Sequence, residues 1–189
     1  MTWLNDEVIN TFMKLLDARD QQLCGASPGR RRSHFFTSFF LTKLKGTGYN
    51  YQGVKRWTKK VKVFELDKVY VPVNVNNMHW CMAVIYIQQK RIQYYDSMMG
   101  TGEPTLKSLL SWLGDETKHK LEKKFNMEEW ELVQTSSSTP QQQNGSDCGA
   151  FSCAFAWYIS EGLPLSFSQE DIPNMRNRML WSLLNQRID

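Results

Sequence analysis

The chain has 189 residues, of which 41% are hydrophobic and 13% aromatic, and its formal net charge is +4 at pH 7. This length predicts a single domain over residues 1–189, and the composition argues against a disordered chain. The mild charge argues against a nucleic-acid reader, and the lack of any long apolar run predicts no membrane insertion. The N-terminus lacks the charged-then-apolar order of a signal peptide, so we expect an intracellular protein.

Basic residues form two loose clusters, at Gly29–Arg32 and at Lys55–Lys62. Clusters of this kind usually form a solvated surface. They can also attract an acidic surface of a partner protein. The sequence leaves both interpretations open.

The cysteines indicate which chemistry is available to the chain. None of them forms a Cys-x-x-Cys pair or has a histidine at zinc-finger spacing, so we predict no metal and no cofactor. A disulfide framework is not expected in an intracellular chain of this length. The cysteines are therefore core residues, or one of them is reactive: Cys24, Cys81, Cys148 and Cys153.

The N-terminal third of the sequence is mostly helical in pattern. Apolar residues recur at helical spacing near the start, and Asn5 or Asp6 is placed to cap that helix. In chain order we expect an amphipathic helix over residues 4–18, a polar loop over 19–34, a part-strand and part-helix segment over 35–44, and a short helix within 49–60.

The middle of the sequence changes to a strand pattern. Lys68–Val75 is rich in β-branched residues, and Pro72 within it suggests a sheet edge or a strand end. The nearly continuous apolar run Trp80–Gln88 is typical of a buried strand. Arg91–Tyr95 alternates, and the short turn Gln88–Lys90 before it predicts that these two strands form a hairpin.

The C-terminal part returns to helices. The segment that begins at Cys148 is apolar on nearly all sides, which marks a buried central helix. The whole pattern predicts an α+β fold, with helix-rich ends around a mixed central sheet. The expected elements are a helix over 106–125, a short strand over 130–134, a polar loop over 136–146, the buried helix over 148–159, and a final helix over 168–186 that Ser166 or Ser168 caps.

Cys148 is placed where a polar loop meets the start of a buried helix. A helix N-terminus presents free N–H groups and the positive end of a dipole, and both stabilise a thiolate. The thiolate is the reactive form of cysteine. Cys148 is therefore a candidate nucleophile, although a structural cysteine at a helix start would give the same local pattern.

A cysteine nucleophile needs a base, and the chain offers three histidines. His34 follows a basic, surface-like run, and His119 lies between two lysines that would oppose an imidazolium. His79 begins the apolar strand, which places it at a rim with a rigid element behind it. His79 is therefore the predicted base, although a histidine at a strand start is often structural.

Asp96 directly follows the second strand of the predicted hairpin. In an antiparallel pair the start of one strand lies beside the end of the other, so Asp96 is expected near His79. A carboxylate there would fix the imidazole tautomer. An amide from Gln142 could join the Cys148 N–H as an oxyanion donor, but Gln141 and Gln143 compete for that role and spacing alone does not separate them.

The order and spacing of His79, Asp96, Gln142 and Cys148 resemble those of the ubiquitin-like-protein-specific proteases, and in particular their sentrin-specific (SUMO) branch. Family catalytic domains usually carry a further segment before the first shared motif, so we expect this chain to lack it. The resemblance covers essentially the whole chain through Trp3-Leu4-Asn5-Asp6, Lys55-Arg56-Trp57-Thr58-Lys59, His79-Trp80, Tyr95-Asp96-Ser97-Met98 and Gln141-Gln142-Gln143-Asn144-Gly145-Ser146-Asp147-Cys148-Gly149.

The resemblance implies a papain-like cysteine protease fold of the adenain/Ulp type, in which helices flank a central mixed sheet. It implies that His79, Asp96 and Cys148 form the triad and that Gln142 is the oxyanion donor. It also implies that two indoles form a narrow tunnel over a Gly-Gly tail, where a Cβ branch would not fit. The implied substrate-binding residues are Trp3 and Trp80 for the tail, Asp6, Phe39, Arg56 and Trp57 for the globular surface of the modifier, and Met98 with no part of the modifier assigned.

The implied function is that of a SUMO-specific cysteine protease. It would hydrolyse the bond after the C-terminal Gly-Gly, in isopeptide deconjugation, precursor maturation or both. The implied partners are SUMO and SUMO-conjugated proteins, and the expected state is a monomer in the nucleus or at the nuclear envelope. No metal or cofactor is implied.

Three alternatives stay open in the sequence. One is a protease for another ubiquitin-like modifier, and another is a non-catalytic module that binds SUMO. The third is a cysteine acyltransferase that uses a thioester donor on the same scaffold, against which Trp3, Trp80 and Gln142 argue.

Overall fold

The computed structural model describes residues 2–188, and its centre is a mixed five-stranded sheet of order β1-β2-β3-β4-β5. Strands β2 and β3 and strands β3 and β4 pair antiparallel, whereas β1 pairs parallel with β2 and β4 pairs parallel with β5. The predicted hairpin is confirmed as β3–β4. The strands are β1 (His34–Phe35), β2 (Lys68–Val75), β3 (His79–Tyr86), β4 (Arg91–Tyr95) and β5 (Glu131–Val133).

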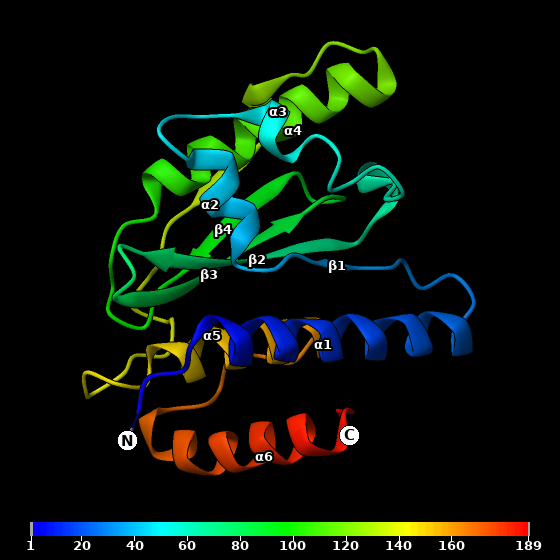
Figure 1. Ribbon diagram of the computed structural model, residues 1–189. Coiled ribbons are helices and arrows are strands. Elements are labelled where there is room, and N and C mark those ends of the chain that lie inside the picture. Colours follow the sequence, from blue (N-terminus) through cyan, green and yellow to red (C-terminus); the bar gives the residue numbers. More distant parts are fainter. Residues whose placement is uncertain (1, 189) are drawn as a thin grey trace.

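Helices cover both faces of this sheet (Figure 1). One face carries α1 (Asp6–Ala26) and α5 (Cys148–Glu161), and α6 (Ile172–Asn185) packs on these two helices on the side away from the sheet. The other face carries α2 (Phe39–Lys45), α3 (Tyr51–Val54) and α4 (Glu103–Leu121). Three 3₁₀ helices complete the described chain, at Val63–Glu65 (η1), Met127–Glu129 (η2) and Gln169–Asp171 (η3).

Two hydrophobic cores lie on the two sides of the sheet, and β3 serves both. Trp80 and Met82 belong to the core with α1 and α5, whereas Ala83 and Ile85 belong to the core with α2 and α4. Successive side chains of a strand point to opposite faces, so a strand between two cores is apolar at nearly every position. This explains the continuous apolar run in the sequence. None of the helices within residues 2–188 combines the length and apolarity that crossing a bilayer requires.

The N-terminal helix is longer than predicted. It runs to Ala26, so the predicted polar loop over 19–34 is wrong for its first part. Asp20, on this extension, is buried and accepts hydrogen bonds from Arg32 Nε at 3.1 Å and from the Ser33 N–H at 2.8 Å. Arg19 pairs with Glu161 at the end of α5. Polar side chains thus stabilise this helix through partners distant in sequence, which a periodicity argument does not detect.

The final helix begins later than predicted. Ser168 caps the 3₁₀ turn η3 through a capping box with Asp171, and α6 begins only at Ile172. The predicted cap is therefore present, but it belongs to η3. The proline after Ile172 at the start of α6 fits this break, since proline is tolerated in the first turn of a helix.

Pro72 lies inside β2, at a locally unpaired edge. The Phe36 N–H donates to Tyr70 O at 2.9 Å, and the last residue pair between β1 and β2 is Phe35↔Tyr70. Residues two apart in a strand present their backbone to the same side. Pro72 therefore faces the β1 side beyond the end of β1, where its missing N–H removes no ladder hydrogen bond.

Candidate active site

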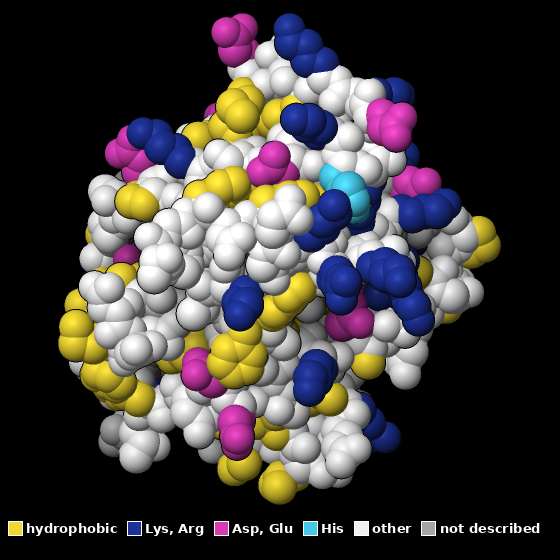
Figure 2. Space-filling model, turned by 45° about the horizontal axis from the view of Figure 1, so that its top comes forward, with side chains coloured by type: hydrophobic (Ala, Val, Ile, Leu, Met, Phe, Trp, Pro, Cys, Tyr) yellow, Lys and Arg dark blue, Asp and Glu magenta, His cyan; other side chains and the backbone are white. Residues whose placement is uncertain are grey.

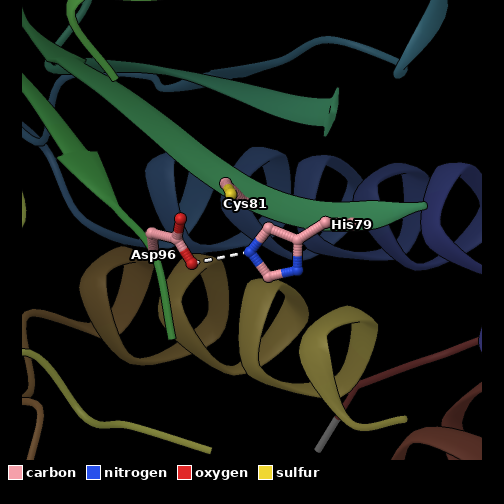
Figure 3. A group of neighbouring side chains, drawn as sticks. All are labelled: His79, Cys81 and Asp96. Atoms are coloured by element: carbon pink, nitrogen blue, oxygen red, sulfur yellow. Dashed lines mark hydrogen bonds and ion pairs between the residues drawn. The ribbon is translucent and has the colours of Figure 1, made fainter. Parts of the chain in front are cut away.

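The hairpin places His79 and Asp96 beside each other, as predicted. His79 is the first residue of β3, and Asp96 follows the end of β4, where the last pair of the ladder is Met82↔Tyr95. His79 Nε2 lies 2.6 Å from Asp96 Oδ1, and the ring points from its strand toward the carboxylate (Figure 3). Residues 17 apart in sequence thus meet because a tight turn joins the two strands.

Asp96 is held as an ionised, oriented carboxylate. It is buried, and Oδ1 also accepts from the Met98 N–H at 2.7 Å while Oδ2 accepts from the Gly100 N–H at 3.1 Å. Burial alone raises the pKa of this carboxyl, but the hydrogen bonds from His79 and Met98 outweigh it and leave the pKa below its ordinary value. The carboxylate can therefore fix the tautomer and orientation of the His79 ring.

His79 is held as an imidazolium. The hydrogen bond to Asp96, followed by those to the thiols of Cys148 and Cys81, raises the pKa of His79 to about 12, although burial acts in the opposite direction. One ring nitrogen bonds Asp96, so the other ring nitrogen is the one available for Cys148. In this state the ring is a proton donor close to the thiol.

Cys148 is the first residue of α5 and is buried. Burial raises the pKa of its thiol, but the hydrogen bond from His79 and those from the backbone N–H groups of Trp80 and Gly149 bring the pKa below its ordinary value. The positive end of the helix dipole acts in the same direction. The structure thus places His79 between Asp96 and Cys148, an arrangement that favours a thiolate–imidazolium pair.

Gln142 differs from Gln141 and Gln143 because hydrogen bonds hold its side-chain amide in place. Its backbone N–H donates to Ser97 O at 3.0 Å, the Ser97 hydroxyl donates to its Oε1 at 2.6 Å, and its Nε2 donates to Asn144 O at 2.5 Å. Because a carbonyl oxygen only accepts, the Asn144 contact fixes which end of the amide carries nitrogen. Gln141 and Gln143 are exposed, and the Gln143 N–H bonds Gln169 instead.

The two tryptophans of the predicted tunnel both bond backbone carbonyls near the nucleophile. Trp3 Nε1 donates to Gly145 O at 2.9 Å, and Trp80 Nε1 donates to Leu4 O at 3.0 Å. A Cβ at Gly149 would lie 2.9 Å from Leu4 Cβ, so Gly149 is needed for the close packing of the N-terminal segment on α5. The Trp3 ring is 54% exposed, whereas Trp80 is buried.

Four of the predicted modifier contacts gather around α2. Phe39, the first residue of α2, is 54% exposed, and the Trp57 ring packs 5.8 Å from the adjacent Phe40. Asp6 accepts from the hydroxyl of Ser38 at 3.5 Å, beside Phe39. Arg56 is exposed next to Trp57. The structure thus supplies a partly apolar, partly charged surface at residues well separated in sequence.

Met98 lies apart from those four residues. Its side chain is 61% exposed, and its backbone N–H bonds the Asp96 carboxylate. It therefore lies on the rim of the predicted catalytic group.

A hollow of about 1420 Å³ lies away from His79, Asp96 and Cys148. It lies between the segment after α3 and the end of α4, and Figure 2 shows Lys and Arg side chains gathered on one side of this face. Its cationic rim includes Arg56, one of the predicted modifier contacts. The basic cluster therefore continues from the α2 surface, and its lining cations are Lys55, Arg56, Lys59, Lys60, Lys62 and Lys120.

Cys81 is a site residue that the sequence interpretation left in the core. Its sulfur and the ligand atoms of His79 and Asp96 all lie within 4.8 Å of one another (Figure 3). Two ligands on one zinc ion would lie about 3.3 Å apart. The 2.6 Å separation of His79 Nε2 and Asp96 Oδ1 therefore fits a hydrogen bond and not a shared ion. The sequence did contain a signal for this proximity. His79 and Cys81 are two residues apart on a strand, so their side chains lie on the same face of the sheet.

Comparison with known proteins gives a consistent result. Residues 2–186 match the Ulp1 protease family, C-terminal catalytic domain. Sentrin-specific protease 2 of Homo sapiens is 42% identical over 187 residues, and ubiquitin-like-specific protease 1A of Arabidopsis thaliana is 38% identical over 196 residues. These matches cover 98% and 99% of this chain but 30% and 38% of the two relatives, so the chain spans well under half of their length.

Solved structures of related domains agree with this family match. The C-terminal Ulp1 protease domain in complex with Smt3, the yeast ortholog of SUMO, superposes with a TM-score of 0.79 at 34% identity and covers 97% of this chain and 77% of that chain. The Chaetomium thermophilum Ulp1-like SUMO protease catalytic domain superposes with a TM-score of 0.82 at 27% identity, covering 98% of this chain and 73% of that chain.

Proposed function

Because the chain belongs to the Ulp1 protease family, we propose that it is a SUMO-specific cysteine protease that hydrolyses the bond after the C-terminal Gly-Gly of the modifier. The α+β fold of this family, predicted from the sequence, is confirmed. The observation that carries the proposal is the 2.6 Å contact of His79 with Asp96, together with the effect of His79 that lowers the pKa of the Cys148 thiol.

The reaction is acyl transfer to water. The Cys148 thiolate attacks the carbonyl carbon of the terminal glycine, and His79 gives its proton to the leaving amine as the C–N bond breaks. The amine is a lysine side chain in deconjugation and a peptide N-terminus in maturation. Water, deprotonated by His79, then attacks the thioester, and the C–S bond breaks to restore the thiolate–imidazolium pair. The released glycine carboxyl group gives its proton to the solvent.

The oxyanion is held by two donors, the Cys148 backbone N–H and the Gln142 amide. The tether from Ser97 and Asn144 to Gln142 supports this role, because it holds the amide in one orientation before substrate arrives. Preorganised donors of this kind stabilise the charge that develops in the transition state, and losing one costs about 10²–10³ in rate.

Specificity for a Gly-Gly tail comes from the two indoles at the site entrance. Both indole N–H groups bond backbone carbonyls, which fixes the Trp3 ring against the loop that precedes Cys148 and the Trp80 ring against the N-terminal segment at Leu4. A channel between fixed aromatic rings admits glycine and excludes residues with a Cβ branch.

Affinity for the folded part of the modifier comes from Asp6, Phe39, Arg56 and Trp57 around α2, with Met98 on the rim of the catalytic group. The basic hollow that continues from Arg56 favours an acidic partner surface and would raise the rate of association. The related yeast domain was solved in complex with Smt3, the yeast ortholog of SUMO, which supports SUMO as the modifier here. A location in the nucleus or at the nuclear envelope stays a prediction from the family.

The test is the cleavage of SUMO and of ubiquitin that each carry a fluorogenic C-terminal amide. The wild type should release the fluorophore from SUMO, and Cys148→Ala should not. Cys24→Ala is the matched control, because Cys24 is a half-exposed free thiol on α1, and it should retain activity.

Turnover of ubiquitin in preference to SUMO would assign another modifier. Binding of SUMO by folded wild-type protein without turnover would replace the protease by a binding module. Full activity of Cys148→Ala would overturn the mechanism.

A further inference from the structure

The residue immediately before the nucleophile is a fully buried carboxylate. Asp147 has a side-chain exposure of 0%. It occupies the N-cap position of α5, but its side chain makes no capping hydrogen bond to that helix. A buried charge needs partners, and Asp147 finds them elsewhere.

Both carboxylate oxygens of Asp147 are saturated by side chains. Oδ1 accepts from Arg176 Nε at 2.8 Å and lies 2.6 Å from Arg176 Nη2. Oδ2 accepts from Asn144 Nδ2 at 2.7 Å and from Gln169 Nε2 at 2.9 Å. These bonds hold the pKa of Asp147 below its ordinary value despite the opposing effect of burial.

Arg176 also binds the backbone of the loop that carries the nucleophile. Its Nη2 donates to Ser146 O at 3.0 Å, so one guanidinium fixes both the carbonyl before Asp147 and the Asp147 side chain. The planar fork of arginine suits such a multiple contact, which a lysine point charge cannot reproduce. Gln169 adds a second tie, because its Oε1 accepts from the Gln143 N–H at 2.8 Å.

Arg176 lies on α6 and Gln169 on η3, at the C-terminal end of the chain. In Figure 1, α6 lies beyond α1 and α5, on the side away from the sheet and from β3. The loop before Cys148 is thus tied to a segment that contributes no residue to the predicted triad.

The charge of Asp147 matters because this residue directly precedes Cys148 in the sequence. His79 is the titratable group whose charge and hydrogen bond lower the pKa of the Cys148 thiol, and Cys81 and Asp96 lie close to His79. An unpaired carboxylate one residue away would oppose the thiolate. The Arg176 guanidinium removes that opposition.

We propose that Arg176 and Gln169 are positioning residues for Cys148, which hold the loop of residues 144–147 in place and neutralise the buried charge of Asp147 beside the nucleophile. The inference rests on the proposed role of Cys148. It assigns to the C-terminal helix a direct part in setting the reactivity of the site.

The experiment measures the pH dependence of iodoacetamide alkylation of Cys148, followed by mass spectrometry of its peptide. This readout needs no modifier, so its failure is distinct from a failure of the proposed protease activity. Arg176→Met should raise the apparent pKa of the thiol by about one pH unit, because it leaves the charge of Asp147, one residue before Cys148 in the sequence, without its ion-pair partner.

The double variant Asp147→Asn with Arg176→Met separates charge from fold. It removes the unpaired charge and keeps an oxygen that can accept from Asn144 and Gln169, so the apparent thiol pKa should return to the wild-type value. Arg176→Lys, which keeps the charge and loses the fork, should keep the wild-type thiol pKa and lower kcat/KM about tenfold. Arg178→Met is the matched control, since Arg178 lies over the Trp157 ring on the same helix, and it should alter neither property.

An unchanged thiol pKa in folded Arg176→Met would overturn the charge role, as would a double variant that fails to restore it. If Arg176→Met does not fold, Gln169→Ala is decisive, because the half-buried Gln169 carries no charge. That variant should lower kcat/KM about threefold to tenfold with the fold intact. Wild-type kcat/KM in Gln169→Ala would overturn the positioning role.

Discussion

Two buried carboxylates of this protein, Asp96 and Glu116, each face a cation, yet only one pair lies beside a reactive group. Glu116, on α4, is 0% exposed and lies 2.9 Å from Lys120 Nζ. It also accepts from the hydroxyls of Thr58 and Tyr51 at 2.9 Å and 3.0 Å. The pair ties the segment after α3 to α4, and its partners are all structural.

The two pairs differ in how many N–H groups of the cation already have an acceptor. Lys120 Nζ donates to Thr58 O at 2.6 Å and to Val61 O at 2.9 Å in addition to Glu116, which uses its three N–H groups. His79 gives one nitrogen to Asp96 and keeps the other for a thiol. The Asp96–His79 pair thus leaves one ring nitrogen for a third partner, whereas the Glu116–Lys120 pair leaves none of the Lys120 N–H groups free.

The largest effect is expected when the catalytic pair is broken without a loss of volume. Asp96→Asn should lower kcat/KM about 10³-fold or more, because an amide in that position can donate to Nε2 and hold the ring in the wrong tautomer. Steady-state cleavage of the fluorogenic SUMO amide measures the loss. Thermal unfolding should change little; a loss of activity below tenfold in the folded variant would remove Asp96 from the triad.

Breaking the Glu116–Lys120 pair should lower the stability of the protein and leave kcat/KM unchanged, the reverse of what is expected for Asp96→Asn. Glu116→Ala leaves Lys120 and two hydroxyls without their acceptor and should destabilise the protein by about 3 kcal/mol. Urea unfolding measures the change, and Lys118→Ala, an exposed change on the same helix, is the control. The kcat/KM of the folded fraction should stay at the wild-type value. A thousandfold loss there would erase the contrast between the two pairs.

A smaller effect is expected from the residue that links Asp96 to the oxyanion donor. Ser97→Ala removes the hydroxyl that bonds Gln142 Oε1, and kcat should fall about tenfold with little change in KM. A double-mutant cycle with Gln142→Ala tests whether Ser97 acts through Gln142, because the effect of Ser97→Ala on kcat should vanish once the Gln142 amide is removed. Additive losses would show that Ser97 acts through something other than Gln142.

The smallest effect is a displacement of the pH profile. The pKa of Cys148 lies below its ordinary value, so the acid limb of kcat/KM should lie at a pH below that of an ordinary thiol. Activity falls on the alkaline side when His79 loses its proton, and its pKa of about 12 places that limb at high pH. Asp96→Asn removes the main cause of the raised His79 pKa. It should therefore move the alkaline limb to lower pH and the acid limb to higher pH, which a profile of residual kcat/KM measures; identical limbs in both proteins would contradict the assignment.

The hairpin and the triad could be predicted from the sequence because their signals are local. The apolar run of β3, the turn at Gln88–Lys90 and the alternation of β4 specify antiparallel pairing, and pairing alone brings His79 to Asp96. The start of α5 at Cys148 was likewise visible as the change from a polar loop to a continuous apolar segment.

The residues that the sequence did not reveal act through long-range polar contacts. Ser97 meets Gln142 across 45 positions, and Arg176 meets Asp147 across 29. Serine and arginine are common surface residues, so nothing in their local pattern marks such a partner. The extension of α1 to Ala26 was not predicted for the same reason. The contact of Arg32 with Asp20 stabilises a polar stretch that has no apolar periodicity.

By itself the sequence predicted the α+β class and the hairpin at the centre of the sheet, because short-range periodicity and turn chemistry specify them. The motifs shared with the protease family added the residues of the predicted triad. Only the tertiary structure decided which glutamine is tethered, why Gly149 is glycine and which cations neutralise the buried carboxylates. Those features depend on the distances between side chains from separate elements. Such distances exist only once both faces of the sheet are packed.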